Sequence, residues 1–322
     1  MTTYKGIRGL TIRTVAGDTD PVALGDIWYN NVAKKIRIGK TTAASWSTGG
    51  NLNQARVALG AFGSQTANAV FGGFNPPAIL ALVEEYDGTS WTEVTDLPTS
   101  IYRNAGCGTQ TAGLTMPGRT SGNTTETYEY DGTNWTETGD YPVSTSRTCA
   151  AGTQTAGLGY SGYNPAGNKT SEYNGSTWTE VNNLGTSRYN SAFGGLQTAA
   201  LFITGYPESP PTAVVTNVES YDGTNWTEIG DVNTARAELA STIQGTPSSM
   251  VIYGGGPPTG ALTETWDGTS WTETTDMPAA KGACSGGGTE DAGLVAGGNP
   301  GVQATVFEFK GVHVAAGSVT SS

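Results

Sequence analysis

Six tryptophans recur along the chain at intervals of 43 to 48 residues, and the sequence around five of them is nearly the same. The sixth is Trp46, and the five copies are EYDGTSWTEV from Glu85, EYDGTNWTET from Glu129, EYNGSTWTEV from Glu172, SYDGTNWTEI from Ser220 and TWDGTSWTET from Thr265. A period of about 40 to 50 residues with one tryptophan hairpin is typical of the four-stranded blades of a β-propeller. The repeat therefore predicts one all-β domain.

Each period divides into four strand-like segments. The first is rich in small residues, as in NAGCGTQT after Arg103, which suits the crowded strand nearest the channel of a propeller. The second is apolar, and the third ends in Glu-Tyr or a similar pair. An Asp-Gly or Asn-Gly turn, which accepts positive φ, then leads to the tryptophan of the fourth strand.

The two ends of the repeat array complement each other. Six copies of the first three strands can be counted, and the last ends after Phe309 without a tryptophan. Trp46, by contrast, precedes the first copy and has no blade of its own. We expect Trp46 to supply the fourth strand of the sixth blade, which would remove the exposed edges of an open array. The predicted fold is a six-bladed propeller over residues 46–311, closed by an N-terminal strand.

Residues 1–45 and 312–322 lie outside the repeat. The segment GDIWYNNVAKKIRIG, which begins at Gly25, predicts a short β-hairpin with its turn after Asn30. We therefore interpret residues 1–45 as an N-terminal extension. Residues 312–322 are mostly small and polar, and are expected to form a flexible tail.

The composition limits the classes of partner. A net charge of −12 argues against nucleic acid and against an anionic membrane surface. The chain has no apolar stretch long enough for a signal peptide or a membrane span, so neither is expected. Cys107, Cys149 and Cys284 fall in different repeats and are expected to be separate buried thiols, as in a reducing cytoplasm.

The glycine pairs Gly72-Gly73, Gly255-Gly256 and Gly297-Gly298, followed by an aromatic residue and a tryptophan, resemble kelch-type propellers. Three repeats depart from this pattern with Pro117-Gly118, Ser161-Gly162 and Thr204-Gly205. The segments KGIRGLTIRTVAGD, GDIWYNN, YDGTNWTE and GTQTA are also similar to kelch-like structural proteins of marine bacteriophages, especially those that infect cyanobacteria. This resemblance implies a virion component, such as a tail fibre, adhesin or surface decoration, assembled in the host cytoplasm. Its implied partners are other virion proteins and a host-surface glycan or outer-membrane protein.

Catalysis is not expected. His313 is the only histidine, so no histidine-based triad or multi-histidine metal site can form, and we predict no cofactor. Each DGT turn offers one carboxylate, or none at Asn174, which is too few for a calcium loop. Two alternatives remain open: an intracellular kelch scaffold that docks a protein, and an enzyme that cleaves carbohydrate with paired carboxylates.

One basic position recurs just before the small-residue strand. A ring of such cations could bind an anion at the channel mouth. We favour the alternative that each base pairs with an acid of the same period. The bases are Arg56, Arg103, Arg147, Arg188, Arg236 and Lys281, and the acids are Glu85, Glu129, Glu172, Glu219, Glu264 and Glu308.

Loops between the second and third strands differ in every copy, whereas the QTA and DGT turns of the opposite face are nearly constant. We call the side with the variable loops the loop face and expect it to bind ligand or partner. The candidate residues there are Phe74, Asn75, Tyr102, Arg119, Tyr163, Asn164 and Tyr206. A basic cluster in the extension predicts docking onto an acidic virion protein, unless the hairpin only caps the propeller. The docking candidates are Trp28, Tyr29, Lys34, Lys35 and Arg37.

Overall fold

The computed structural model describes residues 12–18, 22–163, 168–208, 213–256 and 260–318. In these residues it contains strands and turns but no helix, so the chain is all-β as predicted. The chain divides into two compact units. Unit 1 comprises Met1–Ser45 and Gly311–Ser322, and unit 2 comprises Trp46–Lys310.

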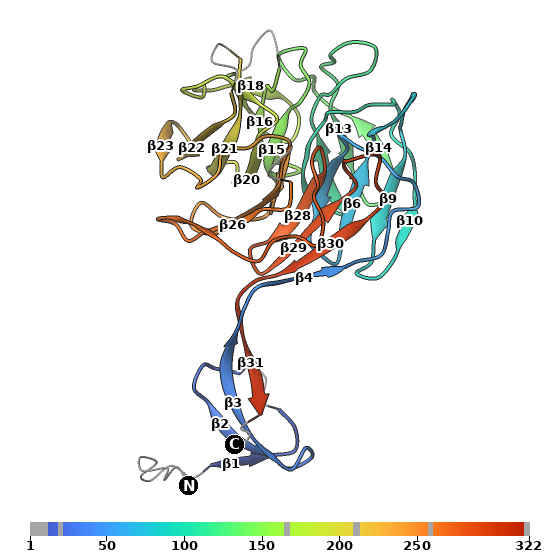
Figure 1. The fold of residues 1–322 in the computed structure, drawn as a ribbon. Helices are drawn as coiled ribbons and strands as arrows, with labels where there is room; N and C mark the ends of the chain where they lie inside the picture. Colours follow the sequence, from blue (N-terminus) through green and yellow to red (C-terminus); the bar gives the residue numbers. More distant parts are fainter. Residues whose placement is uncertain (1–11, 19–21, 164–167, 209–212, 257–259, 319–322) are drawn as a thin grey trace. The chain divides into compact units, whose positions relative to one another are not determined.

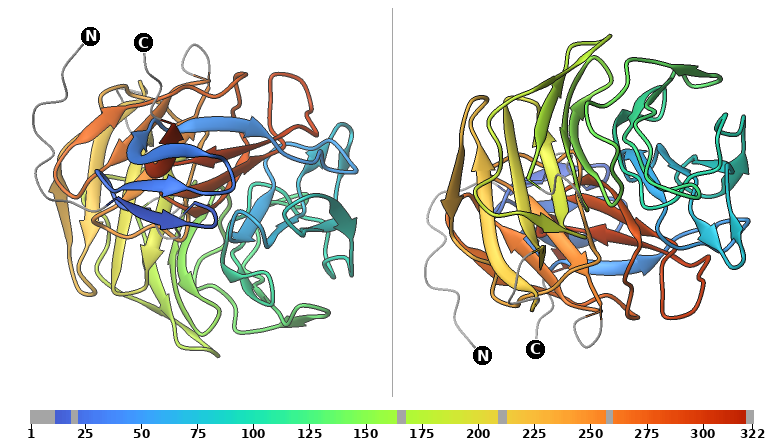
Figure 2. Two further views of the ribbon diagram at one scale, coloured as in Figure 1. Left: turned by 90° about the horizontal axis from the view of Figure 1, so that it is seen from below. Right: turned by 90° about the horizontal axis from the view of Figure 1, so that it is seen from above.

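Unit 2 is built from antiparallel sheets, mostly of four strands, arranged in the manner of a β-propeller (Figures 1 and 2). A short hairpin of β7 (Phe74–Asn75) and β8 (Ala78–Ile79) stands apart from them. We number the sheets by the position of their small-residue strand in the chain: the first contains β5 (Gly60–Gly63), β6 (Asn68–Phe71), β9 (Val83–Tyr86) and β10 (Trp91–Glu93), and the second contains β11 (Gly106–Thr109), β12 (Ala112–Thr115), β13 (Tyr128–Tyr130) and β14 (Trp135–Glu137). The third contains β15 (Cys149–Thr153), β16 (Ala156–Tyr160), β17 (Thr170–Tyr173) and β18 (Trp178–Glu180), and the fourth contains β19 (Arg188–Tyr189), β20 (Ala192–Leu196), β21 (Ala199–Pro207), β22 (Val215–Tyr221) and β23 (Trp226–Ile229). The fifth contains β24 (Leu239–Ser241), β25 (Met250–Gly254), β26 (Thr263–Trp266) and β27 (Trp271–Glu273), and the sixth contains β28 (Ser285–Thr289), β29 (Ala292–Ala296), β30 (Val306–Lys310) and, from the N-terminal side of the repeats, β4 (Ser45–Thr48).

The small-residue strands of neighbouring sheets lie against one another. β5 contacts β11, and the contacts continue through β15, β20, β24 and β28, which in turn contacts β5. At Gly286 a Cβ atom would come within 2.2 Å of the carbonyl oxygen of Ser241 in the adjoining strand. Such close approach of backbones explains why these strands contain glycine, alanine and serine.

The hairpin tryptophans connect each sheet to the preceding one. The indole Nε1 of Trp135 donates to the carbonyl oxygen of Thr95 at 3.0 Å, and that of Trp271 donates to Gly230 at 3.1 Å. Trp46 donates in the same way to Thr275, at 3.0 Å. The prediction that these side chains pack between sheets is confirmed, since a buried indole needs both apolar contacts and a hydrogen-bond acceptor.

A tyrosine and a glutamate form a second link between sheets. The four hydroxyl donations are Tyr86 to Glu308 (2.6 Å), Tyr130 to Glu85 (2.9 Å), Tyr173 to Glu129 (2.7 Å) and Tyr221 to Glu172 (3.0 Å). Where Ser220 or Thr265 replaces the acid, the next sheet has Trp266 or Phe309 instead of tyrosine. Acid and tyrosine therefore vary together. The expectation that Glu85, Glu129, Glu172 and Glu308 neutralise the basic position is wrong, because they accept these hydroxyls instead.

The Asp-Gly turns are held by their own backbone. Oδ1 of Asp87 accepts the N–H groups of Thr89 and Ser90, both at 2.8 Å. Asp131, Asp222 and Asp267 do the same, and Asn174 accepts the equivalent bonds through its amide oxygen. The predicted structural role of these turns is confirmed. The N–H groups of Ser90 and Thr89 lower the pKa of Asp87, and the equivalent groups lower the pKa of the other three aspartates.

Replacing these four aspartates together with asparagine should reduce the acid sensitivity of the protein. A carboxylate whose folded-state pKa is depressed stabilises the fold fully above its unfolded pKa of about 3.9, and that stabilisation is lost as the pH falls through the folded value. Thermal melting between about pH 6 and pH 3 should therefore show a smaller fall in Tm for the variant. An unchanged pH profile would show that the turns do not contribute. Asparagine is a suitable replacement because Asn174 already forms the turn of the third sheet.

Unit 1 contains one four-stranded sheet, in the order β1 (Arg13–Val15), β2 (Ile27–Asn30), β3 (Lys35–Thr42) and β31 (His313–Ser318). β2 and β3 form the predicted hairpin, and Oδ1 of Asn30 holds its turn by accepting the N–H groups of Val32 and Ala33. The C-terminal segment differs from the expected flexible tail, because β31 pairs with β3 between Arg37 and Thr42. This pairing covers an edge of β3 that would otherwise be exposed.

Candidate functional site

Six residues that precede the small-residue strands share an unusual backbone conformation. They are Ala58, Arg103, Arg147, Asn190, Glu238 and Ala283, and their φ angles lie between 47° and 61°. We call this the ring position. The N–H group of Arg103 donates to the carbonyl oxygen of Ala58 at 2.7 Å, and that of Arg147 donates to Arg103 at 2.7 Å. Similar bonds run from Glu238 to Asn190, from Ala283 to Glu238 and from Ala58 to Ala283, each 2.8 Å long. Left-handed backbone at non-glycine residues is strained and gathers at functional sites.

The basic residues of the repeat occupy two different positions. Arg56, Arg188 and Arg236 are buried, and each forms an ion pair, with Glu84, Glu219 and Glu264 respectively, at 2.8 to 2.9 Å. Burial lowers the pKa of all three guanidinium groups. Lys281 is also buried, and its ammonium donates to the carbonyl oxygens of Gly297 and Thr305, while burial lowers its pKa to about 8. These four cations therefore have their partners inside unit 2.

Arg103 and Arg147 do not belong to this buried set. They lie at the ring position, two residues further along, and Ile101 and Thr145 take the buried place in their repeats. The prediction of one basic ring is therefore wrong. The acidic partner changes as well: Tyr128 accompanies Ile101, and Ser171 accompanies Thr145.

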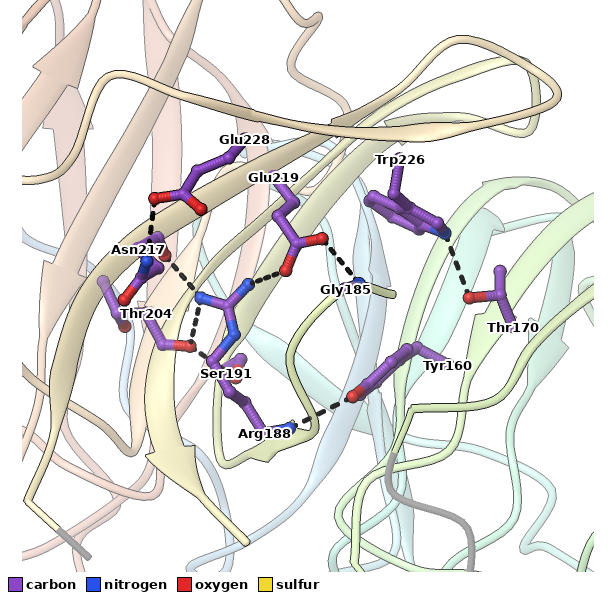
Figure 3. A network of polar contacts seen from close by, with 10 residues as sticks. All are labelled: Tyr160, Thr170, Gly185, Arg188, Ser191, Thr204, Asn217, Glu219, Trp226 and Glu228. Atoms are coloured by element: carbon purple, nitrogen blue, oxygen red, sulfur yellow. Dashed lines mark hydrogen bonds and ion pairs between the residues drawn. The ribbon is translucent and has the colours of Figure 1, made fainter. Parts of the chain in front are cut away.

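The fourth sheet shows the buried pair in detail (Figure 3). One guanidinium nitrogen of Arg188, Nη2, donates to Oε1 of Glu219 at 2.8 Å. The other, Nη1, donates to the carbonyl oxygens of Thr204 at 3.4 Å and Asn217 at 2.5 Å. Oε2 of Glu219 accepts the N–H group of Gly185 at 2.8 Å. Both terminal nitrogens of the guanidinium thus donate inside the protein, and only the buried Nε has no acceptor, so this arginine is not available to a ligand.

A pocket of about 250 Å³ opens at the ring position. The segments that lead into the small-residue strands of all six sheets line it, together with Phe74 and Asn299 of the loop face; we call it the channel-mouth pocket. Arg103, Arg147, Asn190 and Glu238 line it, and so does Asn104. Asn104 is only 7% exposed, and neither Nδ2 nor Oδ1 of its side chain has a hydrogen-bond partner. A smaller pocket of about 110 Å³, also lined by Asn104, lies along the first strands.

Each of the two arginines in the pocket lies against a cluster of aromatic side chains. The ring centroids of Phe74 and Tyr102 are 5.4 Å apart, and the guanidinium carbon of Arg103 lies 5.3 Å from the Tyr102 ring. On the third and fourth sheets, the guanidinium carbon of Arg147 lies 4.9 Å from the rings of both Tyr163 and Tyr189. Tyr189 also stacks on Tyr206 at 5.6 Å. Two of the predicted loop-face aromatics, Tyr102 and Tyr163, thus lie against the arginines, and the other two, Phe74 and Tyr206, pack on neighbouring tyrosines.

The remaining loop-face candidates contribute less. Asn75 pairs with Ala78 in the β7–β8 hairpin, and the backbone of Arg119 bridges to Tyr102. Asn164 lies outside the described residues. The prediction from the sequence did not include Asn104, Tyr189, Asn190 or Glu238. In the four repeats that have a buried base, the ring position is the second residue after it, an offset that can be read from the sequence.

In unit 1 the docking candidates separate by exposure. Trp28 is 2% exposed, and Arg37 donates to Asp18 through Nε at 2.9 Å, an interaction that lowers the pKa of Asp18 to about 2. Lys34 and Lys35 are exposed. Tyr29 is half-buried and pairs in register with Ile36.

The described residues bear on two further features, metal ligands and membrane-spanning helices. No group of three or more histidine, cysteine, aspartate or glutamate side chains there could hold a metal ion. His313 lies in β31, with Nδ1 3.0 Å from the carbonyl oxygen of Gly311. No helix that is long and apolar enough to cross a membrane occurs in the same residues.

Comparison of the sequence with protein-family models gives no match. A search of curated proteins likewise finds no similar protein. A functional assignment therefore depends on the residues of the loop face and of unit 1.

Proposed function

We propose that unit 2 is a six-bladed, kelch-like β-propeller that β4 closes. Contact between β28 and β5 supports this proposal, as does the hydrogen bond from Tyr86 to Glu308. Gln65 adds two further bonds between the first and sixth sheets, to the carbonyl oxygens of Gly293 and Phe309 at 2.8 and 2.7 Å. Trp46 has the same relation to the fifth sheet as the other hairpin tryptophans have to their neighbours.

The propeller acts as a non-enzymatic binding protein through its loop face. The observation that carries this proposal is the channel-mouth pocket, where two arginines meet beside the unpartnered amide of Asn104. The constant residues of the opposite face already serve the fold. Gln110, for example, donates to the carbonyl oxygens of Asn68 and Tyr86 in the preceding sheet. The loop face is the side with polar groups still available for a ligand.

The protein is a virion component, such as a tail fibre, adhesin or decoration, assembled in the host cytoplasm. The resemblance of its N-terminal and hairpin segments to phage structural proteins supports this role. Unit 1 docks onto another virion protein, and the loop face binds a host-surface glycan or outer-membrane protein. Docking depends on the exposed pair Lys34 and Lys35, because Trp28 is buried and Arg37 is paired with Asp18.

An exposed apolar surface in unit 1 also supports docking. Ile27 pairs with Ile38 and Tyr29 pairs with Ile36, so these four side chains share one face of the β2–β3 hairpin. Ile27 is 42% exposed and Ile36 is 39% exposed. Lys35 precedes Ile36 in β3 and therefore points to the other face of the hairpin, so unit 1 offers an exposed apolar face for packing and a basic group for an acidic partner.

Reversing the charge of both lysines, Lys34→Glu with Lys35→Glu, should abolish incorporation into phage particles, because the acidic partner would then repel unit 1. Mass spectrometry of purified particles measures incorporation. The matched control is Lys310→Glu, which reverses an exposed charge in unit 2 and should leave incorporation intact.

Alanine at Phe74, Tyr163 and Tyr206 should leave incorporation intact and weaken attachment to host cells. Absence of the unaltered protein from particles would count decisively against the virion role. Loss of incorporation in the loop-face variants, with normal incorporation of the lysine variant, would reverse the roles proposed for unit 1 and the loop face.

A further inference from the structure

We propose that the channel-mouth pocket binds an acidic sugar, with the carboxylate or sulfate group of the sugar held between Arg103 and Arg147. This inference rests on the loop face being the binding side, as proposed above. It adds the chemical class of the ligand and the residues that recognise it.

The positive charges of Arg103 and Arg147 favour an anionic ligand in the pocket. Neither Arg103 nor Arg147 forms an ion pair within the described residues, although Arg56, Arg188 and Arg236 each have a glutamate. The pKa of Arg103 is lowered, first by burial and then by the nearby charge of Arg147, and the charge of Glu238 offsets this only in part. Two half-buried like charges are unfavourable unless an anion lies between them. Guanidinium groups bind carboxylate and sulfate oxygens through paired, charge-assisted hydrogen bonds.

The remaining polar groups suit hydroxyls. Asn104 offers one buried donor group and one buried acceptor, both without a partner. Leaving such groups unpaired is costly, so a ligand that satisfies them gains affinity. Glu238 lines the same pocket, and its Oε1 accepts from the side-chain amide of Asn190 at 3.2 Å. With two arginines and one glutamate, the pocket remains positive while still offering an acceptor for a hydroxyl donor.

Size and aromatic lining favour a sugar ring over a bare ion. A volume of about 250 Å³ exceeds what an inorganic anion needs, yet falls below the roughly 300–1,000 Å³ of drug-sized sites. Phe74 and Tyr102 line the pocket and offer apolar faces for the C–H groups of a ring. The backbone bonds at the ring position fix the main chain of both arginines, and contacts with tyrosine rings restrict their guanidinium groups, which lowers the entropy lost on binding.

The test is calorimetry of the full chain with D-glucuronate, D-glucose and inorganic sulfate as probes. Glucuronate should bind, and glucose and sulfate should each bind at least about tenfold more weakly. Arg103→Asn and Arg147→Asn should each weaken glucuronate binding by about tenfold or more, as expected for the loss of a charge-assisted hydrogen bond. Asparagine is chosen because Asn190 occupies the same ring position at φ 55°. Lys310→Gln, which removes an exposed charge elsewhere in unit 2, should have no effect.

Equal affinity for glucose and glucuronate, or unchanged glucuronate binding in both arginine variants, would overturn the inference. Sulfate that binds as tightly as glucuronate would overturn the assignment to a sugar. Failure of this inference can be told apart from failure of the virion role. If the protein is present in particles but does not bind glucuronate, only the ligand assignment fails. If it binds glucuronate but is absent from particles, only the virion role fails.

Discussion

Replacing Glu219 with alanine should lower the free energy of unfolding by about 3–5 kcal/mol, the usual cost of removing one partner from a buried ion pair. The guanidinium of Arg188 is fully buried and would keep its charge without a counter-ion. The Coulomb energy of the pair is not what decides this value. The cost arises because the remaining charge cannot be solvated. Chemical unfolding, followed by tryptophan fluorescence, measures the effect.

The chain itself suggests a compensating change. In the third repeat, Thr145 and Ser171 occupy the places of Arg188 and Glu219. The double variant Arg188→Thr with Glu219→Ser should therefore be more stable than Glu219→Ala, because no charge is left buried. A double-mutant cycle on the two positions isolates their coupling.

The exposed pair Lys169 and Glu180 provides the matched control. Glu180→Ala should cost no more than about 1 kcal/mol, since exposed ion pairs contribute little. If Glu219→Ala lowers the free energy of unfolding no more than Glu180→Ala does, the loss of the counter-ion of Arg188 does not carry the expected cost.

Much of the all-β architecture could be predicted because its signals are local. A turn that needs positive φ requires glycine at positions such as Gly88, and the strand that follows begins with Trp91. These requirements recur in each repeat and can be identified without knowledge of distant contacts. β31 has no such signal, because its partner β3 lies near the other end of the chain.

The candidate site was only partly predictable. Loop variation selected Phe74, Tyr102, Tyr163 and Tyr206 as candidates. In the structure Tyr102 and Tyr163 lie against two arginines, whereas Phe74 and Tyr206 pack on neighbouring tyrosines. The prediction treated Arg103 and Arg56 as equivalent because both precede a small-residue strand, although Gln65 follows Arg56 by nine residues and Gln110 follows Arg103 by seven. A difference of two residues places one side chain in the pocket and the other in a buried ion pair.

The sequence also did not show which of two adjacent glutamates pairs with the buried arginine. Glu84 and Glu85 are adjacent in β9 and therefore point to opposite sides of the sheet. Glu84 accepts from Arg56, whereas Glu85 accepts from the hydroxyl of Tyr130 in the next sheet. A one-residue difference in register thus decides which acid neutralises the buried base, and pairing between sheets determines that register.

Removing β4 should cause the propeller to aggregate. Residues 51–310 lack this strand, whereas residues 45–310 retain it, and both fragments lack unit 1 except Ser45 in the longer one. Without β4, the edge of β30 would expose unpaired backbone groups next to the buried side chains of Val306 and Phe309. Exposed edges of this kind pair with other chains.

The loss of Trp46 adds to this effect. Its ring lies 5.1 Å from Phe309 and 5.3 Å from Tyr253, so it joins the sixth sheet to the fifth. Losing these contacts should lower the Tm of fragment 51–310 by about 10 °C or more relative to fragment 45–310. Light scattering after size-exclusion chromatography measures association, and calorimetry measures the Tm. A monomeric fragment 51–310 with the Tm of fragment 45–310 would show that the six sheets hold together without β4, and the proposed closure would then be wrong.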